Sequence, residues 1–238
     1  MINLTEIQDW KRISFKDAWD KQSVLAEELK SWKRGAKDLS DMPAHKIIYC
    51  EHLPVYTLGK SGSMDNLLLS NQGLSDEGIE FYKINRGGDI TYHGPGQIVC
   101  YPILDLERIF TDVHKYIRTL EEVVIRTLTH YNINGARIKD YTGVWLEKSA
   151  VLPERKICAI GVHMSRWVTL HGFAFNINTD LSYFNKIIPC GISDSTKAVT
   201  SLELELCHKV DTEEVKSYLN YYLSELFGLK YAVVPDLN

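Results

Sequence analysis

A glycine-rich stretch between Glu80 and Ile103 constrains the fold of this chain more than any other segment. Its centre, from Asn85 to Gln97, reads Asn-Arg-Gly-Gly-Asp-Ile-Thr-Tyr-His-Gly-Pro-Gly-Gln and holds four of the chain's 15 glycines. β-like runs flank it on both sides, at residues 80–84 and 97–103. Glycine allows positive φ angles and a close approach of the backbone to a ligand. The pattern therefore predicts a strand, a ligand-facing bend with Arg86 and His93 at its two ends, and a second strand.

The same composition is open to a second interpretation, a hairpin with a wide glycine-rich turn and no ligand. The stretch is not a P-loop, because no Gly-Lys-Ser/Thr follows the glycines. It does not open a helix with a G-x-G-x-x-G pattern either, as a dinucleotide-binding loop does. Neither of these common nucleotide-binding patterns is present.

Length and composition indicate one globular domain, which we expect to span residues 1–238. The chain is 45% apolar and 24% charged and carries a net charge of −4, which argues against a nucleic-acid surface as its main function. No apolar run reaches the roughly 18 residues that a spanning helix needs, and the first residues lack the pattern of a signal peptide. The five cysteines include no C-x-x-C pair, so we expect a reducing, cytoplasmic location and no membrane association.

Helices and strands alternate without a strict βαβ rhythm, which predicts an α+β fold rather than a doubly wound sheet. Ser14 is a candidate N-cap, and apolar residues at helical spacing predict a helix from Phe15 to about Arg34. Similar periodicity predicts a long helix over Thr111–Tyr131 and a last helix that Asp211 caps and Gly228 ends. Two β-runs, Lys156–Met164 and Val168–Ile177, are predicted to form a hairpin.

The end of the first predicted helix is basic, with Lys30, Lys33, Arg34 and Lys37 close together. One interpretation is a solvated helix end, since cations near the C-terminus are favoured by the helix dipole. The alternative is a docking surface for an acidic partner protein.

Cys190 and Lys156 are the candidate reactive residues. Cys190 lies between Pro189 and Gly191, which indicates a loop with exposed backbone, so the thiol can face a cleft with a backbone N–H as oxyanion donor. A cysteine in an apolar run is more often an inert small hydrophobe. Lys156 opens an otherwise apolar strand, and a cation about 4 Å from a thiol lowers the thiol pKa by up to about three units. The alternative for Lys156 is a solvated lysine at a strand end.

The eight histidines show no H-E-x-x-H or Cys/His ligand spacing, so no metal is expected. His93 and His171 are better interpreted as hydrogen-bonding groups in the wall of a site. Each can equally be a structural histidine with satisfied hydrogen bonds.

Four stretches together resemble the lipoyl(octanoyl) transferase family. Residues 86–103 are similar to its R-G-G-x-x-T-Y-H-G-P-G-Q…Y-P-I signature, and residues 156–162 to its K-I-A-x-[IL]-G-[VI] strand. His171–Asn176 matches the H-G-x-A-x-N run, and Ile188–Ile192 matches the I-x-P-C-G-I loop. All four stand in the family's order.

The resemblance implies the α+β fold of the biotin and lipoate protein ligase catalytic domains, with a central mixed sheet flanked by helices. It implies transfer of an octanoyl group from octanoyl-acyl carrier protein to a lysine of lipoyl domains, in E2 subunits of 2-oxoacid dehydrogenases and in the glycine cleavage H protein, with no cofactor. By position, Cys190 is implied as the nucleophile that becomes the octanoyl thioester, and Lys156 as the group that lowers its pKa and shuttles protons. The residues implied to line the acyl site are Arg86, Gly87, Gly88, Asp89, Ile90, Thr91, Tyr92, His93, Ala159, Ile160, Gly161, Gly172, Phe173 and Ala174.

The sequence departs from the family pattern at two places. The segment Glu147–Arg155 is longer than the usual turn, and Cys158 stands where the family usually has alanine. Since residues i and i+2 of a strand share a face, Cys158 is expected beside Lys156, as a packing substitution or as a second thiol near the site.

Three rival functions remain open from the sequence: an ATP-dependent lipoate or biotin ligase, a non-catalytic acyl-binding protein, and a cysteine hydrolase. The ligase does not need Cys190, and the binding protein needs neither Cys190 nor Lys156. The hydrolase would release free octanoate in the absence of a lipoyl domain.

Overall fold

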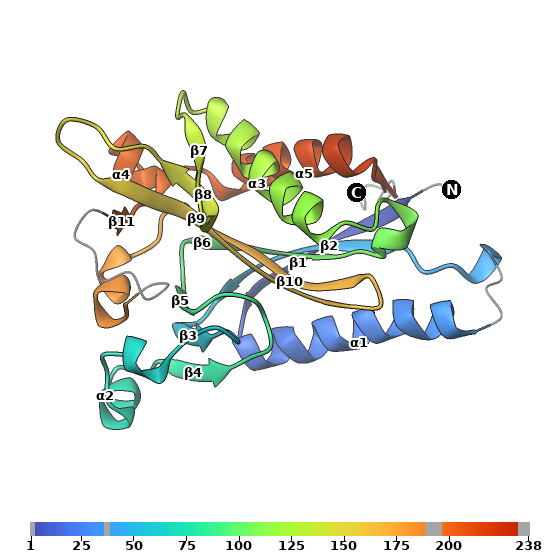
Figure 1. Ribbon diagram of the computed structural model, residues 1–238, viewed down its shortest axis with the longest axis horizontal. Coiled ribbons are helices and arrows are strands. Elements are labelled where there is room, and N and C mark those ends of the chain that lie inside the picture. Colours follow the sequence, from blue (N-terminus) through green and yellow to red (C-terminus); the bar gives the residue numbers. More distant parts are fainter. Residues whose placement is uncertain (1–2, 36–38, 189–196, 233–238) are drawn as a thin grey trace, which may run out of the picture.

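Nine strands of the described residues form one large mixed sheet. The computed structural model describes residues 3–35, 39–188 and 197–232 (Figure 1). Within these ranges the strand order is β12-β1-β2-β6-β10-β9-β8-β7, and β11 pairs with β9. The strands are β1 (Leu4–Ile13), β2 (His45–His52), β6 (Gln97–Ile103), β7 (Gly135–Ile138), β8 (Tyr141–Leu146), β9 (Glu154–Ser165), β10 (Val168–Asn176), β11 (Lys197–Val199) and β12 (Lys230–Tyr231). Parallel pairs (β1 with β2) and antiparallel pairs (β6 with β10) occur together, which confirms the predicted α+β class with a mixed sheet.

A second, three-stranded sheet contains the centre of the glycine-rich stretch. Its order is β4-β3-β5, with β3 at Val55–Leu58, β4 at Glu80–Lys83 and β5 at Ile90–His93. β5 pairs antiparallel with β3, whereas β6 belongs to the large sheet. The two runs that flank the glycines therefore do not pair with each other, and the interpretation as a simple hairpin is wrong. The glycine-rich stretch instead connects the two sheets.

Long helices cover both faces of the large sheet (Figure 1). α1 (Phe15–Arg34) lies on one face, and α3 (Val113–Thr129) and α5 (Thr212–Phe227) lie on the other. The predicted cap of α1 is present, since Ser14 Oγ accepts a hydrogen bond from Asp17 N at 3.1 Å. The shorter helices are α2 (Asn71–Asp76), α4 (Leu202–Leu206), η1 (Leu39–Asp41), η2 (Met64–Asn66), η3 (Leu106–Arg108) and η4 (Leu181–Lys186).

The two faces of the large sheet carry separate cores. On the α3 and α5 face, buried side chains of the sheet such as Tyr49 and Phe175 pack with Leu120, Val124 and Leu219 of these helices. On the other face, a smaller cluster packs Ala18, Ala26 and Leu29 of α1 against the sheet. Among the described residues, no helix is long and apolar enough to span a membrane. The smaller core leaves room beside it, between the two sheets, for the site.

Candidate active site

A cavity of about 350 Å³ lies between the large sheet and the small sheet. β6, β9 and β10 supply one wall, and β5 with the loop before it supplies the other. Phe15, the first residue of α1, also contributes to the lining. Val99, Ala159 and Ala174 contribute apolar side chains to the wall on the large sheet. Ile160 and Phe173 also border the cavity, but their side chains belong to the core on the α3 and α5 face. The cavity thus offers an apolar surface bounded by the glycine-rich stretch.

Arg86 holds the glycine-rich loop in place. Its side chain is buried, and the guanidinium donates to the carbonyl oxygens of Gly87 at 3.0 Å and of Thr57 at 2.6 Å, and to Thr57 Oγ1 at 2.9 Å. Gly87 N donates to Val162 O of β9 at 2.9 Å, which attaches the loop to the large sheet. Gly88 has a φ angle of 87°, which favours glycine. The glycines therefore shape the loop, and Arg86 fixes it to β3.

Gly161 of β9 permits a close approach of this loop to the large sheet. A Cβ atom at Gly161 would lie 3.0 Å from Arg86 Cδ and 3.0 Å from the carbonyl oxygen of Gly87. Both neighbours would have to shift to accept a side chain. The absence of a side chain at this position lets the loop close over β9.

A buried chain of hydrogen bonds crosses the cavity wall. His93 Nδ1 lies 2.8 Å from Gln97 Oε1, Gln97 Nε2 donates to Asn176 Oδ1 at 2.9 Å, and Asn176 Nδ2 donates to the carbonyl oxygen of Thr200 at 2.9 Å. At the other end, His93 Nε2 lies 3.4 Å from Thr57 Oγ1, which already accepts from Arg86. Since Gln97 Oε1 only accepts, the proton of His93 is assigned to Nδ1. The hydrogen bonds thus connect the small sheet to Thr200, the residue that follows β11, through the uncharged side chains of His93, Gln97 and Asn176.

The histidines around the cavity are held in the neutral form. Burial, helped by neighbouring His52, lowers the pKa of His93 to about 3. Burial also lowers the pKa of His171 to about 3, with Arg86 acting in the same direction, and the pKa of His52 to about 4. His171 has a φ angle of 59°, and its Nε2 lies 3.2 Å from Asn85 Oδ1. At neutral pH these side chains are uncharged and act as hydrogen-bonding groups, as expected for His93 and His171. Both also have hydrogen-bond partners within the protein, as structural histidines do.

Lys156 stands at the junction of the cavity with a second one of about 440 Å³. Both cavities are lined by Lys156, Phe184 and Val199. The Lys156 ammonium lies 4.7 Å from the centre of the Trp145 ring, a cation–π contact. Lys156 is therefore part of the site wall and not the freely solvated strand-end lysine of the alternative interpretation.

The structure brings most of the predicted acyl-site residues together. Twelve of the fourteen line the first cavity, and Gly87 and Tyr92 do not. Tyr92 instead packs on the far side of β5, stacked on Tyr183 with ring centroids 4.6 Å apart. Cys190 lies outside the described residues. The chain lines the cavity on both sides of residues 189–196, with Phe184 before them and Val199 after them.

The expectation that Cys158 shares a face of the strand with Lys156 is wrong. Val144 of β8 pairs with Cys158, whereas the next residue, Trp145, pairs with Lys156, so β9 has one extra residue at this point. Such a β-bulge breaks the alternation of side chains. Cys158 is fully buried in the core on the α3 face, and burial, with Glu121 of α3 acting in the same direction, raises its thiol pKa well above the usual value. Cys158 therefore fits the packing interpretation.

The basic end of α1 does not present the free cluster that a docking surface would need. Lys33 forms a buried ion pair with Asp105 at 2.7 Å and also bonds the carbonyl oxygen of Arg166. Arg34 and Lys30 both pair with Glu27 of the same helix. At 1.5 Å per residue, Arg34 lies about 28 Å along the helix from Phe15, the residue of α1 that lines the cavity. Lys37 lies outside the described residues.

The comparisons with known proteins decide the family. A family model described as lipoyl protein ligase A/B catalytic domain matches residues 17–224. A protein of Cytophaga hutchinsonii named octanoyltransferase is 50% identical over 227 residues, which cover 94% of this chain and 92% of that protein. A Flavobacterium psychrophilum protein of the same name is 53% identical over 230 residues, covering 95% and 98%. The chain belongs to the octanoyltransferase family. It is therefore an acyltransferase that carries octanoyl groups in protein lipoylation, and the ligase alternative is less supported.

Solved structures support the fold of this octanoyltransferase-family chain. A bi-partite lipoate protein ligase from Thermoplasma acidophilum, described with its E2 lipoyl domain, aligns with a TM-score of 0.69 at 15% identity, over 98% of this chain and 86% of that one. A lipoate-protein ligase A bound with ATP aligns with a TM-score of 0.66 at 14% identity, over 98% and 88%. At such low identity the likeness shows the lipoate protein ligase fold alone.

Several residues of the site were not predicted from the sequence. Thr57 and Trp145 stand in unremarkable β-runs, and Phe15 counts as an ordinary apolar residue of α1. Only the folded chain brings them to the cavity or to Lys156. Gln97 and Asn176 stand within the family-like motifs, so their motif positions were an available signal. Across the described ranges, no three His, Cys, Asp or Glu side chains gather as a metal site would require.

Proposed function

We propose that this chain takes an octanoyl group from octanoyl-acyl carrier protein onto Cys190 and passes it to a lysine of a lipoyl domain. The acceptors proposed are lipoyl domains of 2-oxoacid dehydrogenase E2 subunits and the glycine cleavage H protein. The observation that carries the proposal is the cavity itself, which has apolar side chains such as Val99 and Ala174 on the large sheet and Lys156 at its junction with a second cavity.

The cavity suits an acyl chain better than a charged ligand. Its wall on the large sheet includes the apolar side chains of Val99, Ala159 and Ala174, and its histidines are neutral. An octanoyl tail buries six or so methylenes, and at about 0.8 kcal/mol each this amounts to roughly 5 kcal/mol of binding free energy. We therefore assign the residues of the glycine-rich stretch, Ala159–Gly161 and Gly172–Ala174 to binding of the tail.

Two transfers at one thiol complete the reaction. The Cys190 thiolate attacks the carbonyl carbon of the donor thioester, a new C–S bond forms, and the carrier protein leaves as a thiolate that takes up a proton. The acceptor amine then attacks the octanoyl-enzyme, a C–N bond forms, and the Cys190 thiolate leaves. Lys156 is proposed to stabilise this thiolate as an ammonium and to accept the amine proton when neutral. The amide product makes the second transfer downhill, so no ATP is needed.

Further support comes from the protein's relatives and its cysteines. The Thermoplasma acidophilum neighbour is described together with its E2 lipoyl domain, which favours a lipoyl domain as the acceptor here. Cys50, Cys100, Cys158 and Cys207 are free thiols, which favours a reducing compartment, and we propose the cytoplasm. We also propose that residues 1–238 act as a single catalytic domain.

Intact-protein mass spectrometry tests the proposal. The wild type, Cys190→Ala and Cys158→Ala are each mixed with octanoyl-acyl carrier protein, and a lipoyl domain is then added. The expected result is an octanoyl adduct that only Cys190→Ala loses and that the lipoyl domain discharges. Loss of the adduct in Cys158→Ala alone would overturn the assignment of the nucleophile.

The same samples separate the rival functions. Modification of the lipoyl domain only when ATP and free octanoate are supplied, with no adduct, would favour the ligase. Release of octanoate without a lipoyl domain would indicate a hydrolase. Binding of octanoyl-acyl carrier protein without any turnover would indicate a non-catalytic acyl-binding protein.

A further inference from the structure

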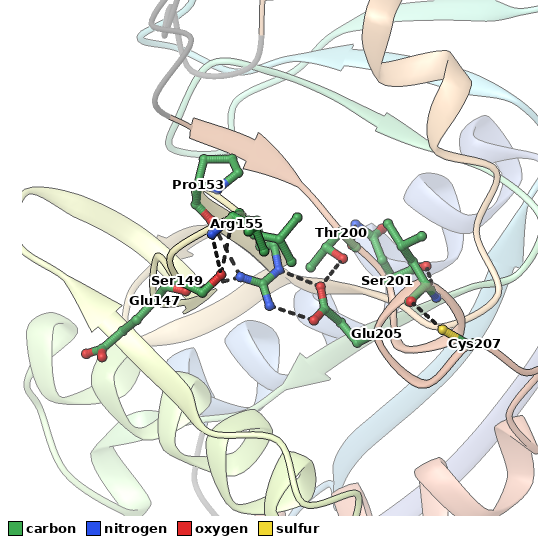
Figure 2. A network of polar contacts seen from close by, with 12 residues as sticks. Glu147, Ser149, Pro153, Arg155, Thr200, Ser201, Glu205 and Cys207 are labelled. Atoms are coloured by element: carbon green, nitrogen blue, oxygen red, sulfur yellow. Dashed lines mark hydrogen bonds and ion pairs between the residues drawn. The ribbon is translucent and has the colours of Figure 1, made fainter.

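A polar cluster lies at the start of β9, next to Lys156 and outside the cavity lining (Figure 2). At its centre, Arg155 and Glu205 of α4 form a two-point ion pair, with Arg155 Nε 2.5 Å from Glu205 Oε1 and Nη2 2.6 Å from Oε2. Both side chains are only 13% exposed. Arg155 Nη1 also donates to the carbonyl oxygen of Glu147 at 3.1 Å. This one guanidinium thus joins β9, the end of the β8 segment and α4.

Thr200 connects this ion pair to the site. Its Oγ1 donates to Glu205 Oε1 at 2.6 Å, its N–H donates to the carbonyl oxygen of Lys156 at 3.0 Å, and its own carbonyl oxygen accepts from Asn176 Nδ2 at 2.9 Å. The side chain of Thr200 is fully buried. Every polar group of this residue is therefore used, and together they bind α4, β9 and β10.

The backbone around Lys156 is held by few strand-to-strand hydrogen bonds, so an additional anchor matters there. The bulge between β8 and β9 interrupts the ladder at residues 156–158. On the other side, three residues of β11 pair with β9 within the described part of the chain, with Val199 opposite Lys156. Two- to three-residue pairings are weak on their own. The ion pair and Thr200 hold β11 and the start of β9 together, while the Lys156 side chain extends to Trp145 and the cavities.

We propose that Arg155, Glu205 and Thr200 are positioning residues for the acyl transfer, which act by fixing the backbone that carries Lys156. The proposal rests on the proposed function, because it takes Lys156 to be the group that sets the reactivity of Cys190. If the anchor is lost, the ammonium no longer stays at the junction of the two cavities, although the acyl cavity itself remains intact. Transfer should then slow while binding of the substrates is unchanged.

The test uses Arg155→Met and Thr200→Val in the full chain, each with a matched control. Lys216→Met breaks the partly buried ion pair of Lys216 with Asp9 (16% and 22% exposed), and Thr127→Val removes a buried threonine hydroxyl of α3. Each of the four is expected to lower Tm by a few degrees. Neither control lies in the cavity lining, so both should retain wild-type transfer.

Two measurements distinguish positioning from a structural role. In single-turnover experiments, discharge of the octanoyl-enzyme by a lipoyl domain should be about tenfold slower in Arg155→Met and a few-fold slower in Thr200→Val, with KM unchanged. The pH dependence of alkylation of Cys190 by iodoacetamide, in a Cys207→Ser background, should show a higher apparent thiol pKa in both variants. Arg155→Lys, which keeps the charge but not the two-point geometry, should fall between Arg155→Met and the wild type.

Either failure is recognisable. If the wild type forms no octanoyl adduct on Cys190, the proposed function fails. If the adduct forms but Arg155→Met and Thr200→Val change discharge and the Cys190 pKa no more than their controls do, the positioning proposal is overturned. A raised KM with an unchanged discharge rate would also overturn it, because it would assign the cluster to substrate binding.

Discussion

The two faces of the large sheet differ in how the space above them is filled, although the same strands form both. On the α3 and α5 face, fully buried apolar side chains such as Tyr49, Leu120 and Leu219 fill the space between sheet and helices. On the α1 face, the second sheet and the glycine-rich loop leave a cavity whose wall carries hydrogen-bonded polar groups. Under the proposed function, the comparison indicates that one face mainly stabilises the fold and the other carries the transfer. Substitutions on one face are expected to change folding, and substitutions on the other to change transfer.

The largest expected effect is that of Lys156→Met, on the cavity face. Methionine keeps a long unbranched side chain against Trp145 but has no charge and no transferable proton. Since a positioned acid–base group contributes about 10²–10⁴-fold, kcat/KM for octanoyl transfer should fall by that factor, with Tm nearly unchanged. Steady-state transfer to a lipoyl domain and a thermal melt check both. A kcat/KM within threefold of the wild-type value would show that octanoyl transfer does not depend on Lys156.

The opposite result is expected for Leu120→Ala, on the α3 face. Leu120 is fully buried in the larger core, and removal of a buried leucine side chain costs about 2–5 kcal/mol of unfolding free energy. Urea unfolding measures this loss. Activity per folded molecule, measured well below the melting transition, should match the wild type. A loss of kcat as large as that of Lys156→Met would contradict the division between the faces.

The two faces also differ in how far the sequence predicts them. Helical periodicity and capping predicted α1 with its observed ends and α5 to within one residue, because these signals are local. α3 was predicted two residues too long at each end, and β11, β12 and α4 were not predicted, because two to five residues are too few to show a period. β5 was missed within the glycine-rich stretch because its pairing with β3 depends on a segment about 35 residues away.

The family-like motifs predicted more of the residues that line the cavity than the periodicity of apolar residues did. The resemblance selected twelve of the residues that line the cavity and also Lys156. The resemblance failed for Gly87 and Tyr92, which do not line the cavity. The alternation of side chains along a strand failed for Cys158. A single bulge turns Cys158 to the α3 core, and nothing in the residues 154–160 themselves marks that bulge. Thr57 reaches Arg86 only through the tertiary fold, so no local signal could identify it.

A smaller effect is expected in the pH dependence of the free energy of unfolding, to which His93 of the cavity wall contributes. The pKa of His93 is about 3 in the folded protein, below its ordinary value of 6.5, so between these values the unfolded chain binds a proton that the folded chain does not. The free energy of unfolding should therefore decrease as the pH falls below 6.5, by about 1.4 kcal/mol per pH unit for this group. In His93→Gln the free energy of unfolding should fall less steeply below pH 6.5, by about 1.4 kcal/mol per pH unit less than in the wild type. Chemical unfolding from pH 7.5 to 5 measures both curves.

The pH range above 7 serves as a control for the two curves of unfolding free energy, those of the wild type and His93→Gln. Above pH 7 they should run parallel, separated only by the packing cost of the substitution, because His93 is then neutral in both states. Equal slopes of the two proteins below pH 6.5 would show that His93 is not held neutral by the cavity wall.

The smallest expected effect concerns the two ends of α1. Phe15 lines the cavity at one end, whereas Glu27 and its partners Lys30 and Arg34 lie about 18 to 28 Å further along the helix. The double variant Lys30→Ala/Arg34→Ala should therefore leave KM for octanoyl-acyl carrier protein within twofold of the wild type, and exposed pairs of this kind contribute little to stability. Measurements at 20 and 150 mM salt sharpen the test, because docking through these charges would be strongest at low salt. A severalfold rise in KM at low salt that disappears at 150 mM would restore the helix end as a docking surface and extend the functional region well beyond the cavity face.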